Sequence, residues 1–346
     1  MKDGYKKPWL NYEEQLGILI KRGLIVDDKS VALNYLKRIG YYRLSGYWFP
    51  FRKRLTKLDL KEKALKKSAI TKSNNFASDE FIESSTFKNA VDLYVFDKRL
   101  RMLAMDALER IEISIRVDIS YTLGKLSKFA YLESAFLHQE FTQIIDPKTG
   151  LTKHHKWLSK NSLLIMRSKE EFVRHNREKY GLPLPIWVAC EVWDFGTLST
   201  LFSGIRSEEQ DQISIKYGIN NGRVFASWLR SLNYLRNVCA HHGRLWNRNI
   251  VEQPKLPFEN DTDWALFFKR NPQSQVRSYL LFVIMRQLLL YINPKSSWPS
   301  QVDELFNKFP DLSHLGLNLK GMGMIEEVNW NSLSMPNKIT PKQSLH

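Results

Sequence analysis

The sequence predicts an all-α protein, and three observations support this fold class. Apolar residues recur at steps of three and four along the 346-residue chain, whereas alternation with a period of two is scarce. Hydrophobic residues make up 43% of the chain, which excludes wholesale disorder and is ample for a core. Breaks such as "GLPLP" (181–185) separate helical regions. We expect roughly ten helices.

The N-terminal part of the chain is strongly basic. Residues 1–75 contain 18 lysines and arginines but only 7 acidic residues, so +11 of the net charge of +16 lies there. This imbalance favours a polyanionic partner, either nucleic acid or an anionic membrane surface. A solvated lysine-rich face is the alternative. We assign residues 1–80 to a basic helical lobe, in which the segment 51–75 is either a basic helix or a loop that follows a phosphate backbone.

An aromatic block, "GYYRLSGYWFPFRKR" (40–54), lies within this lobe. Its rings can form a packed joint between helices, or they can stack on unpaired bases while the arginines hold phosphates. The lysines and arginines that follow are the better candidates for RNA contact. In this region we predict RNA-binding roles for Arg43, Arg52, Lys53, Arg54, Lys57, Lys66 and Lys67.

Residues 81–310 form the predicted main helical domain. A stripe from Leu93 to Ile115 follows helical spacing and predicts a long amphipathic helix. The apolar run 279–292 is interrupted by Arg286 and is too short to span a bilayer, so it predicts a buried helix. The segment 311–346 has little to bury in its last part, and we expect it to be partly disordered. We also expect a cytoplasmic protein without membrane association, because the start lacks an apolar signal sequence.

Neither the carboxylates at 191 and 194 nor the two cysteines are predicted to form a functional site. Glu191 and Asp194 can be viewed as an acid and a base, but the glycine and Thr197 that follow favour an N-cap, with either Asp194 or Thr197 as the cap. Two cysteines, Cys190 and Cys239, are too few for a disulfide framework.

The stretch "RNVCAHHGRLWNR" (236–248) carries the most reactive group of side chains. The preceding segment is a predicted helix, with Gly243 as its C-terminal stop. Its apolar stripe consists of Phe225, Trp228, Leu232, Leu235 and Cys239. Arg236 lies at the edge of this stripe, roughly 140° around the helix axis from His241. A guanidinium in this place should be partly buried and should require an anionic or carbonyl partner.

Three interpretations of this stretch compete. Arg236 and His241 can be ordinary charges at a helix end. A zinc site would need four ligands at suitable spacing, and Cys239 faces the core. The third interpretation is RNA cleavage, in which the 2′-hydroxyl attacks the adjacent phosphate. Histidine can move the protons near neutral pH, and arginine can stabilise the charge on phosphate. This chemistry requires neither a metal nor another cofactor, and we predict none.

Residues 236–241, "RNVCAH", also fit the R-x4–6-H signature of the HEPN superfamily. Three further blocks, 35–51, 94–116 and 185–202, precede this motif in an order that resembles the Abi-like family of bacterial abortive-infection proteins, the AbiD/AbiF group. The resemblance spans roughly residues 10–295. It implies a HEPN-type helical bundle with additional helices, a toxin-like ribonuclease in phage defence, and in some relatives a small non-coding RNA. It places Arg236 and His241 at the signature positions and Asn237 at the polar position after the arginine.

The resemblance also implies a homodimer, because HEPN ribonucleases usually join two such motifs. We therefore expect a metal-independent endoribonuclease toxin with catalytic residues Arg236, Asn237 and His241, and with His242 as an auxiliary. Its products should carry a 2′,3′-cyclic phosphate and a 5′-hydroxyl. Further RNA contacts are predicted for Arg230, Arg244 and Arg248. The alternative is a non-catalytic protein that binds a small structured RNA; a membrane-surface protein that uses the basic segment is a third hypothesis.

Overall fold

The computed structural model describes residues 7–55, 77–258, 261–326 and 328. Contacts between α-carbons divide the chain into two compact units. The first consists of residues 1–99 and 305–319, and the second of residues 100–304 and 320–346. Some predictions fall on residues that are not described. They are the partial disorder of the segment 311–346, of which residues 327 and 329–346 are not described, and the RNA contacts of the lysine-rich segment, which include Lys57, Lys66 and Lys67.

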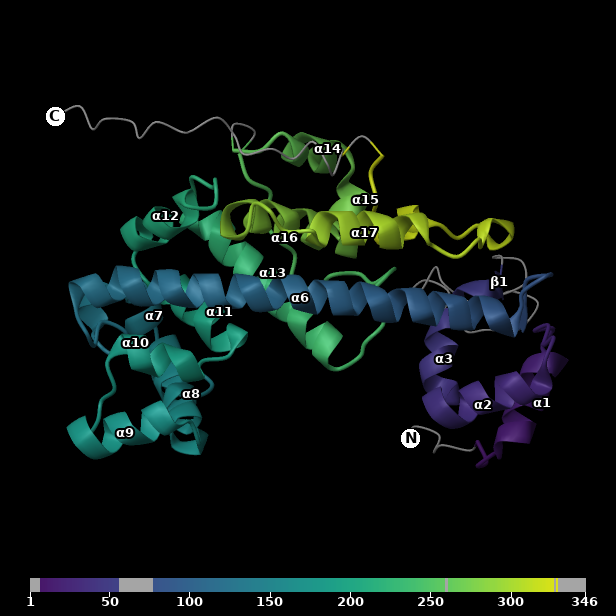
Figure 1. Ribbon diagram of the computed structural model, residues 1–346, viewed down its shortest axis with the longest axis horizontal. Helices are drawn as coiled ribbons and strands as arrows, with labels where there is room; N and C mark the ends of the chain where they lie inside the picture. The colour runs from purple at the N-terminus through teal and green to yellow at the C-terminus, as the bar shows by residue number, and fades with distance from the viewer. Residues whose placement is uncertain (1–6, 56–76, 259–260, 327, 329–346) are drawn as a thin grey trace. The chain divides into compact units, whose positions relative to one another are not determined.

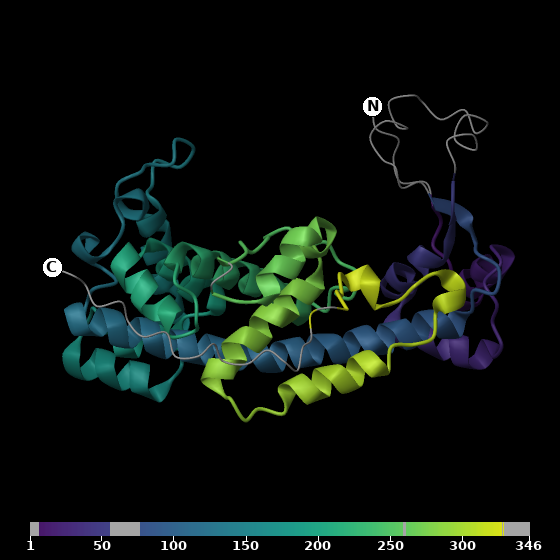
Figure 2. The same ribbon diagram turned by 90° about the horizontal axis from the view of Figure 1, so that it is seen from above.

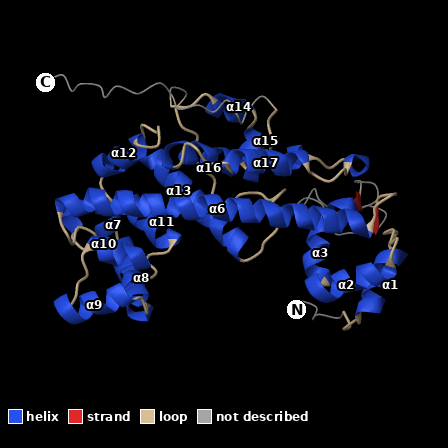
Figure 3. Ribbon diagram, in the orientation of Figure 1, coloured by secondary structure: helices blue, strands red, loops and turns tan. Residues whose placement is uncertain are grey.

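The first unit is helical, with one small sheet. Its elements before the long helix are α1 (Tyr12–Lys21), α2 (Lys29–Ile39), α3 (Tyr41–Trp48), η1 (Phe49–Phe51), β1 (Arg52–Arg54) and β2 (Ala77–Phe81). Strands β1 and β2 pair antiparallel and are the only strands in the described parts of the chain (Figure 3). The unit also contains the start of α6, the end of α17 and the short helix η4 (Ser313–Leu315).

The aromatic block divides between the core and the surface of this unit. Tyr47, Trp48 and Phe51 are at most 2% exposed, and the Tyr47 hydroxyl donates to Asp97 Oδ2 at 2.7 Å. Tyr42 is by contrast 76% exposed. The packed-joint interpretation therefore holds for the second half of the block, because these rings fill the space between α3 and the start of α6.

Helix α6 (Phe87–Leu126) is 40 residues long, and its C-terminal part belongs to the second unit (Figure 1). The predicted stripe is its buried face: Leu100, Ala107, Ile111 and Ile115 are fully buried. Arg101 of the same helix is only 5% exposed although its side chain is charged. Its guanidinium donates to the Gly243 carbonyl at 3.3 Å, and this bond offsets part of the cost of burying the charge.

The remaining elements of the second unit are all helical. They are η2 (Ser134–Phe136), α7 (Gln139–Thr142), α8 (Lys153–Arg167), α9 (Glu171–Tyr180), α10 (Ile186–Ala189), η3 (Cys190–Val192), α11 (Phe195–Gly204), α12 (Ser207–Ile215), α13 (Gly222–Ala240), α14 (Trp264–Arg270), α15 (Pro272–Gln275), α16 (Ser278–Ile292), most of α17 (Trp298–Asn307) and η5 (Leu319–Met322).

Helix α16 is the predicted buried helix, and it lies beside the middle of α6 in both views (Figure 2). Twelve of its fifteen residues are buried. Helix α13 packs against α11, α12 and α16, so the motif-bearing helix is held on several sides. No helix in the described ranges combines the length and apolar character needed to cross a membrane. The all-α prediction is confirmed.

Candidate active site

Helix α13 forms because its two ends are capped and one face is apolar. Asn221 accepts hydrogen bonds from the amides of Arg223 and Val224 at 2.9 and 3.1 Å, which satisfies two of the free amides at the N-terminus. The predicted stripe is buried throughout: Phe225, Trp228, Leu232, Leu235 and Cys239 are each at most 3% exposed. Packing of this face fixes the rotation of the helix, so Arg230, Asn237 and His241 are left exposed.

The helix ends in a tight turn that carries both histidines. The His242 amide donates to the Cys239 carbonyl at 3.0 Å, and the Gly243 amide donates to the Val238 carbonyl at 2.8 Å. This pair of bonds defines a Schellman motif. His241 is the C-cap with a φ of −88°, and His242 occupies the left-handed region with a φ of 56°. Both side chains are exposed.

The prediction that Gly243 ends the helix needs correction. The helix ends at Ala240, and the left-handed position falls on His242, one residue before the glycine. Glycine is favoured at 243 for lack of space. A Cβ added there would lie 3.2 Å from Arg248 Nη1 and 3.3 Å from the Val238 carbonyl oxygen, closer than most real Cβ contacts. Arg101 donates to the Gly243 carbonyl and so connects this turn to α6.

Arg236 is half-buried at the edge of α13, as the helical geometry predicted. Its Nη1 lies 3.4 Å from Asn237 Oδ1. The expected anionic neighbour is Glu112 of α6. Burial raises the pKa of Glu112 above its ordinary value, and the positive charges of Arg116 and Arg236 oppose that rise without cancelling it. Arg236 therefore lies within electrostatic reach of a carboxylate that is partly withdrawn from water.

Glu112 belongs to a small network of charges between α6 and the segment 190–194. Arg116 Nη2 donates to Glu112 Oε1 at 2.9 Å and to the Trp193 carbonyl at 3.0 Å. Its Nη1 lies 3.5 Å from Glu191 Oε2. The side chains of Arg116 and Glu112 are 15% and 20% exposed, so this pair is better shielded from solvent than a surface ion pair. The i, i+4 spacing of Glu112 and Arg116 was visible in the sequence, but the proximity of Arg236 was not.

The carboxylate of Asp194 has a structural role. It accepts from the Thr197 amide at 2.7 Å and the Thr197 hydroxyl at 2.8 Å, which makes Asp194 the N-cap of α11. Its pKa is lowered: burial would raise it, but bonds from Lys160 and Thr197 outweigh burial. The cap prediction is thus confirmed. Among the described residues, no three His, Cys, Asp or Glu side chains are grouped to hold a metal ion, and Cys190 and Cys239 are buried and form no disulfide.

The predicted RNA-binding residues fall into both units. Arg230, Arg244 and Arg248 lie on α13 or just after it, together with the four candidate catalytic residues. Arg248 is engaged within the turn: its Nε donates to the Tyr234 hydroxyl at 2.9 Å, and its Nη1 donates to the Arg244 carbonyl at 3.2 Å.

The first unit holds Arg43, Arg52, Lys53 and Arg54. Arg43 and Arg52 line a cavity of about 1120 Å³. Arg52 also pairs with Asp79 at 3.5 Å, whereas Lys53 pairs with Glu80 at 3.0 Å and Arg54 lies over the Phe49 ring. The charges of Arg52 and Lys53 therefore each already have an acidic partner.

Comparison with known proteins assigns the chain to a family. The family model described as "Abi-like protein" matches residues 34–247, which include α13 and most of the turn after it. The search of curated proteins and the search of solved structures each returned no significant match. Because the family model covers more than half of the 346 residues, this chain belongs to the Abi-like protein family.

Proposed function

We propose that this Abi-like protein is an endoribonuclease toxin of an abortive-infection system that acts against phage. The observation that carries the proposal is the arrangement at the end of α13. An exposed histidine, His241, is held on a hydrogen-bonded turn, and Arg236, half-buried on the same helix, lies within electrostatic reach of the Glu112 carboxylate of α6. A proton-transfer group and a permanent cation are thereby fixed on a well-packed helix, as cleavage of RNA requires.

In the proposed reaction the 2′-hydroxyl of one nucleotide attacks the adjacent phosphorus. The proton of that hydroxyl passes to a base, and the bond from phosphorus to the leaving 5′-oxygen breaks as an acid protonates that oxygen. We assign proton transfer to His241 and stabilisation of the phosphate charge to Arg236. Asn237 orients Arg236 through its Oδ1, and His242 is auxiliary. The products are a 2′,3′-cyclic phosphate and a 5′-hydroxyl, and no metal takes part in these steps.

We further propose that the active form is a homodimer. Arg236 and His241 point roughly 140° apart around the helix axis, so one helix does not bring both groups to one phosphate. A second copy can supply the missing group to each site. RNA is held in addition by Arg230 and Arg244, and in the first unit by the cavity beside Arg43 and Arg52, where the rings of Trp9 and Tyr42 are 86% and 76% exposed.

The test compares wild type, His241→Ala and Arg236→Ala on total RNA in EDTA. His175→Ala is the matched control, because His175 is an exposed histidine next to an arginine, outside the R-x4-H motif. We expect cleavage by wild type and by the control only, roughly a hundredfold or more above each motif variant, with RNA affinity retained in His241→Ala. Cleavage by His241→Ala at the wild-type rate would refute the assignment.

The second candidate function is a protein that binds a small structured RNA without cutting it. The large aromatic and basic cavity of the first unit favours this candidate, since exposed rings and arginines can bind RNA and none of the motif residues lines the cavity. Purified wild-type protein that retains RNA but cleaves none, and whose affinity depends on Arg43 rather than on His241, would support it.

A further inference from the structure

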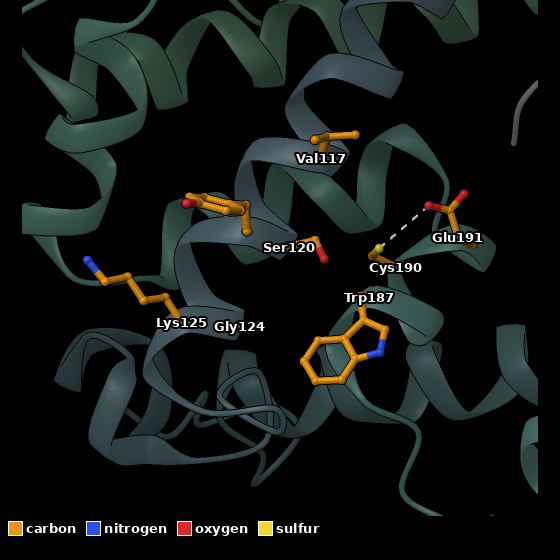
Figure 4. Close-up of a pocket in the computed structure, with 8 residues that line it drawn as sticks. Val117, Ser120, Gly124, Lys125, Trp187, Cys190 and Glu191 are labelled. Atoms are coloured by element: carbon orange, nitrogen blue, oxygen red, sulfur yellow. Dashed lines mark hydrogen bonds between the residues drawn. The ribbon is translucent and has the colours of Figure 1, made fainter.

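A second cavity, of about 440 Å³, lies on the surface of the second unit. One wall is the α6 segment from Val117 to Lys125, and the other is formed by Trp187, Cys190 and Glu191 of α10 and η3 (Figure 4). Neither the motif nor the RNA-binding residues predicted from the sequence belong to it. Its lining is mostly apolar side-chain surface, but it is open to solvent.

Two large aromatic rings line this cavity without being buried by the protein. Tyr121 is 70% exposed and Trp187 is 52% exposed. The Trp187 indole lies close to α6 at Gly124, where an added Cβ would make an ordinary contact of 3.5 Å with Trp187 Cε3. Flat, solvent-exposed rings beside a hollow are the usual platform on which unpaired nucleobases stack.

Lysines near the cavity can meet the phosphates of RNA, whereas the acidic side chain that lines it, Glu191, is paired with Arg116 at 3.5 Å. Lys125 lines the cavity, and Lys216 places its ammonium 5.8 Å from the centre of the Tyr121 ring. The Lys216 ammonium also pairs with Asp118 at 2.7 Å, which fixes its position above the ring. Lysine is depleted at interfaces between proteins, whereas lysine next to exposed aromatic rings suits a backbone phosphate and its base.

The cavity is also connected to the candidate active site through ionic contacts. Glu191 at its edge lies 3.5 Å from Arg116, which bonds to Glu112 at 2.9 Å. Glu112 in turn feels the charge of Arg236.

We infer that this cavity is a nucleobase subsite, which holds one unpaired base of the RNA substrate between Tyr121 and Trp187 with its phosphate at Lys125 and Lys216. The inference rests on the proposed function for the identity of the ligand, RNA. It adds a requirement that the R-x4-H motif does not contain: the RNA must present an unpaired base.

The experiment measures binding of a fluorescent, fully 2′-O-methylated RNA of about 12 nucleotides, which cannot be cleaved because its 2′-oxygens are blocked. The variants are Tyr121→Ala and Trp187→Leu, the second of which keeps an apolar side chain at this position. Tyr180→Ala is the matched control, because Tyr180 is 69% exposed with the Lys179 ammonium 5.2 Å from its ring, but lies outside the cavity. We expect each cavity variant to weaken binding roughly five- to hundredfold and the control to leave it unchanged.

Two further readouts separate the possible outcomes. Photocrosslinking of an RNA that contains 4-thiouridine should label a peptide that includes Tyr121 or Trp187. If both variants bind as tightly as the Tyr180→Ala control, or if they change the sedimentation coefficient without changing RNA affinity, the subsite is refuted; in the second case a second copy of the chain covers the cavity. Binding and crosslinking as expected in a protein that cleaves no RNA would refute the nuclease proposal but not the subsite.

Discussion

The two adjacent histidines after α13 should respond in opposite ways to replacement by glycine. His241 has a φ of −88° and a ψ of 12°, close to helical values, whereas His242 has a φ of 56°. Both are exposed, so loss of either side chain leaves no cavity. In the left-handed region the Cβ of any residue other than glycine crowds the following carbonyl oxygen, at a cost of about 1 kcal/mol. Glycine at a position with a negative φ gains nothing and adds entropy to the unfolded chain.

The magnitudes come from comparing glycine with alanine at each position, which cancels the contribution of the imidazole itself. We expect His242→Gly to be more stable than His242→Ala by about 1 kcal/mol. His241→Gly should be less stable than His241→Ala by about 0.5 kcal/mol. The Schellman bonds are backbone bonds, so all four variants can retain the turn.

Urea unfolding followed by far-UV circular dichroism measures these differences. With a slope of about 2.5 kcal/mol per molar urea, a change of 1 kcal/mol moves the midpoint by about 0.4 M. A shift of the same sign at both positions, or a His242→Gly variant no more stable than His242→Ala, would refute the conformation argued for this turn. RNA cleavage measured on the same samples should fall less in His242→Gly than in His241→Gly, because His242 is only an auxiliary in the proposed reaction.

Charge and burial support three further predictions, each measurable by urea unfolding. Burial raises the pKa of Glu112, so the charged form of this carboxyl destabilises the folded protein. The free energy of unfolding should therefore fall as pH rises from 4.5 through the raised pKa. Glu112→Gln should be at least as stable as wild type at pH 7. Burial lowers the pKa of His154 despite its hydrogen bond to the Tyr131 carbonyl, so the folded protein favours neutral imidazole. Stability should therefore be lost as pH falls from 6.5 through the lowered pKa, and His154→Gln should remove that loss. Asp194→Ala should cost about 1 kcal/mol through loss of the α11 cap, whereas Asp194→Asn should retain most of it.

The sequence was most informative where the periodicity was long and uninterrupted. The stripe from Phe225 to Cys239 predicted which face of α13 is buried, and the apolar run of α16 predicted a buried helix; the structure confirms both. The strands β1 and β2 were not predicted, because three and five residues are too few to show an alternation. Their pairing depends on segments that are distant in the chain.

The surroundings of the motif could not be predicted in the same way. The proximity of Arg236 to Glu112 joins residues 124 positions apart, and the bond from Arg101 to Gly243 joins residues 142 apart. Such contacts are set by the packing of α6 and α13 rather than by local spacing. The left-handed conformation of His242 could not be predicted for a local reason. The adjacent Gly243 is the residue expected to be left-handed, but the presence of glycine at 243 is explained by the short distances to Arg248 and Val238.

The arrangement of α13 makes the proposed dimer testable without a structure of the dimer. Glu112 lies near Arg236 at one edge of the helix, and the C-terminal turn holds His241 roughly 140° away, so one protomer presents two half-sites that face different directions. If each complete site combines Arg236 of one protomer with His241 of the other, a mixture of Arg236→Ala and His241→Ala proteins regains one intact site in every mixed dimer. After subunit exchange in equal amounts, half of the dimers are mixed, and cleavage should return to about a quarter of the wild-type rate. Subunit exchange is shown separately by fluorescence energy transfer. If the exchanged mixture is as inactive as its components, each site either takes Arg236 and His241 from one protomer or needs both residues from both protomers.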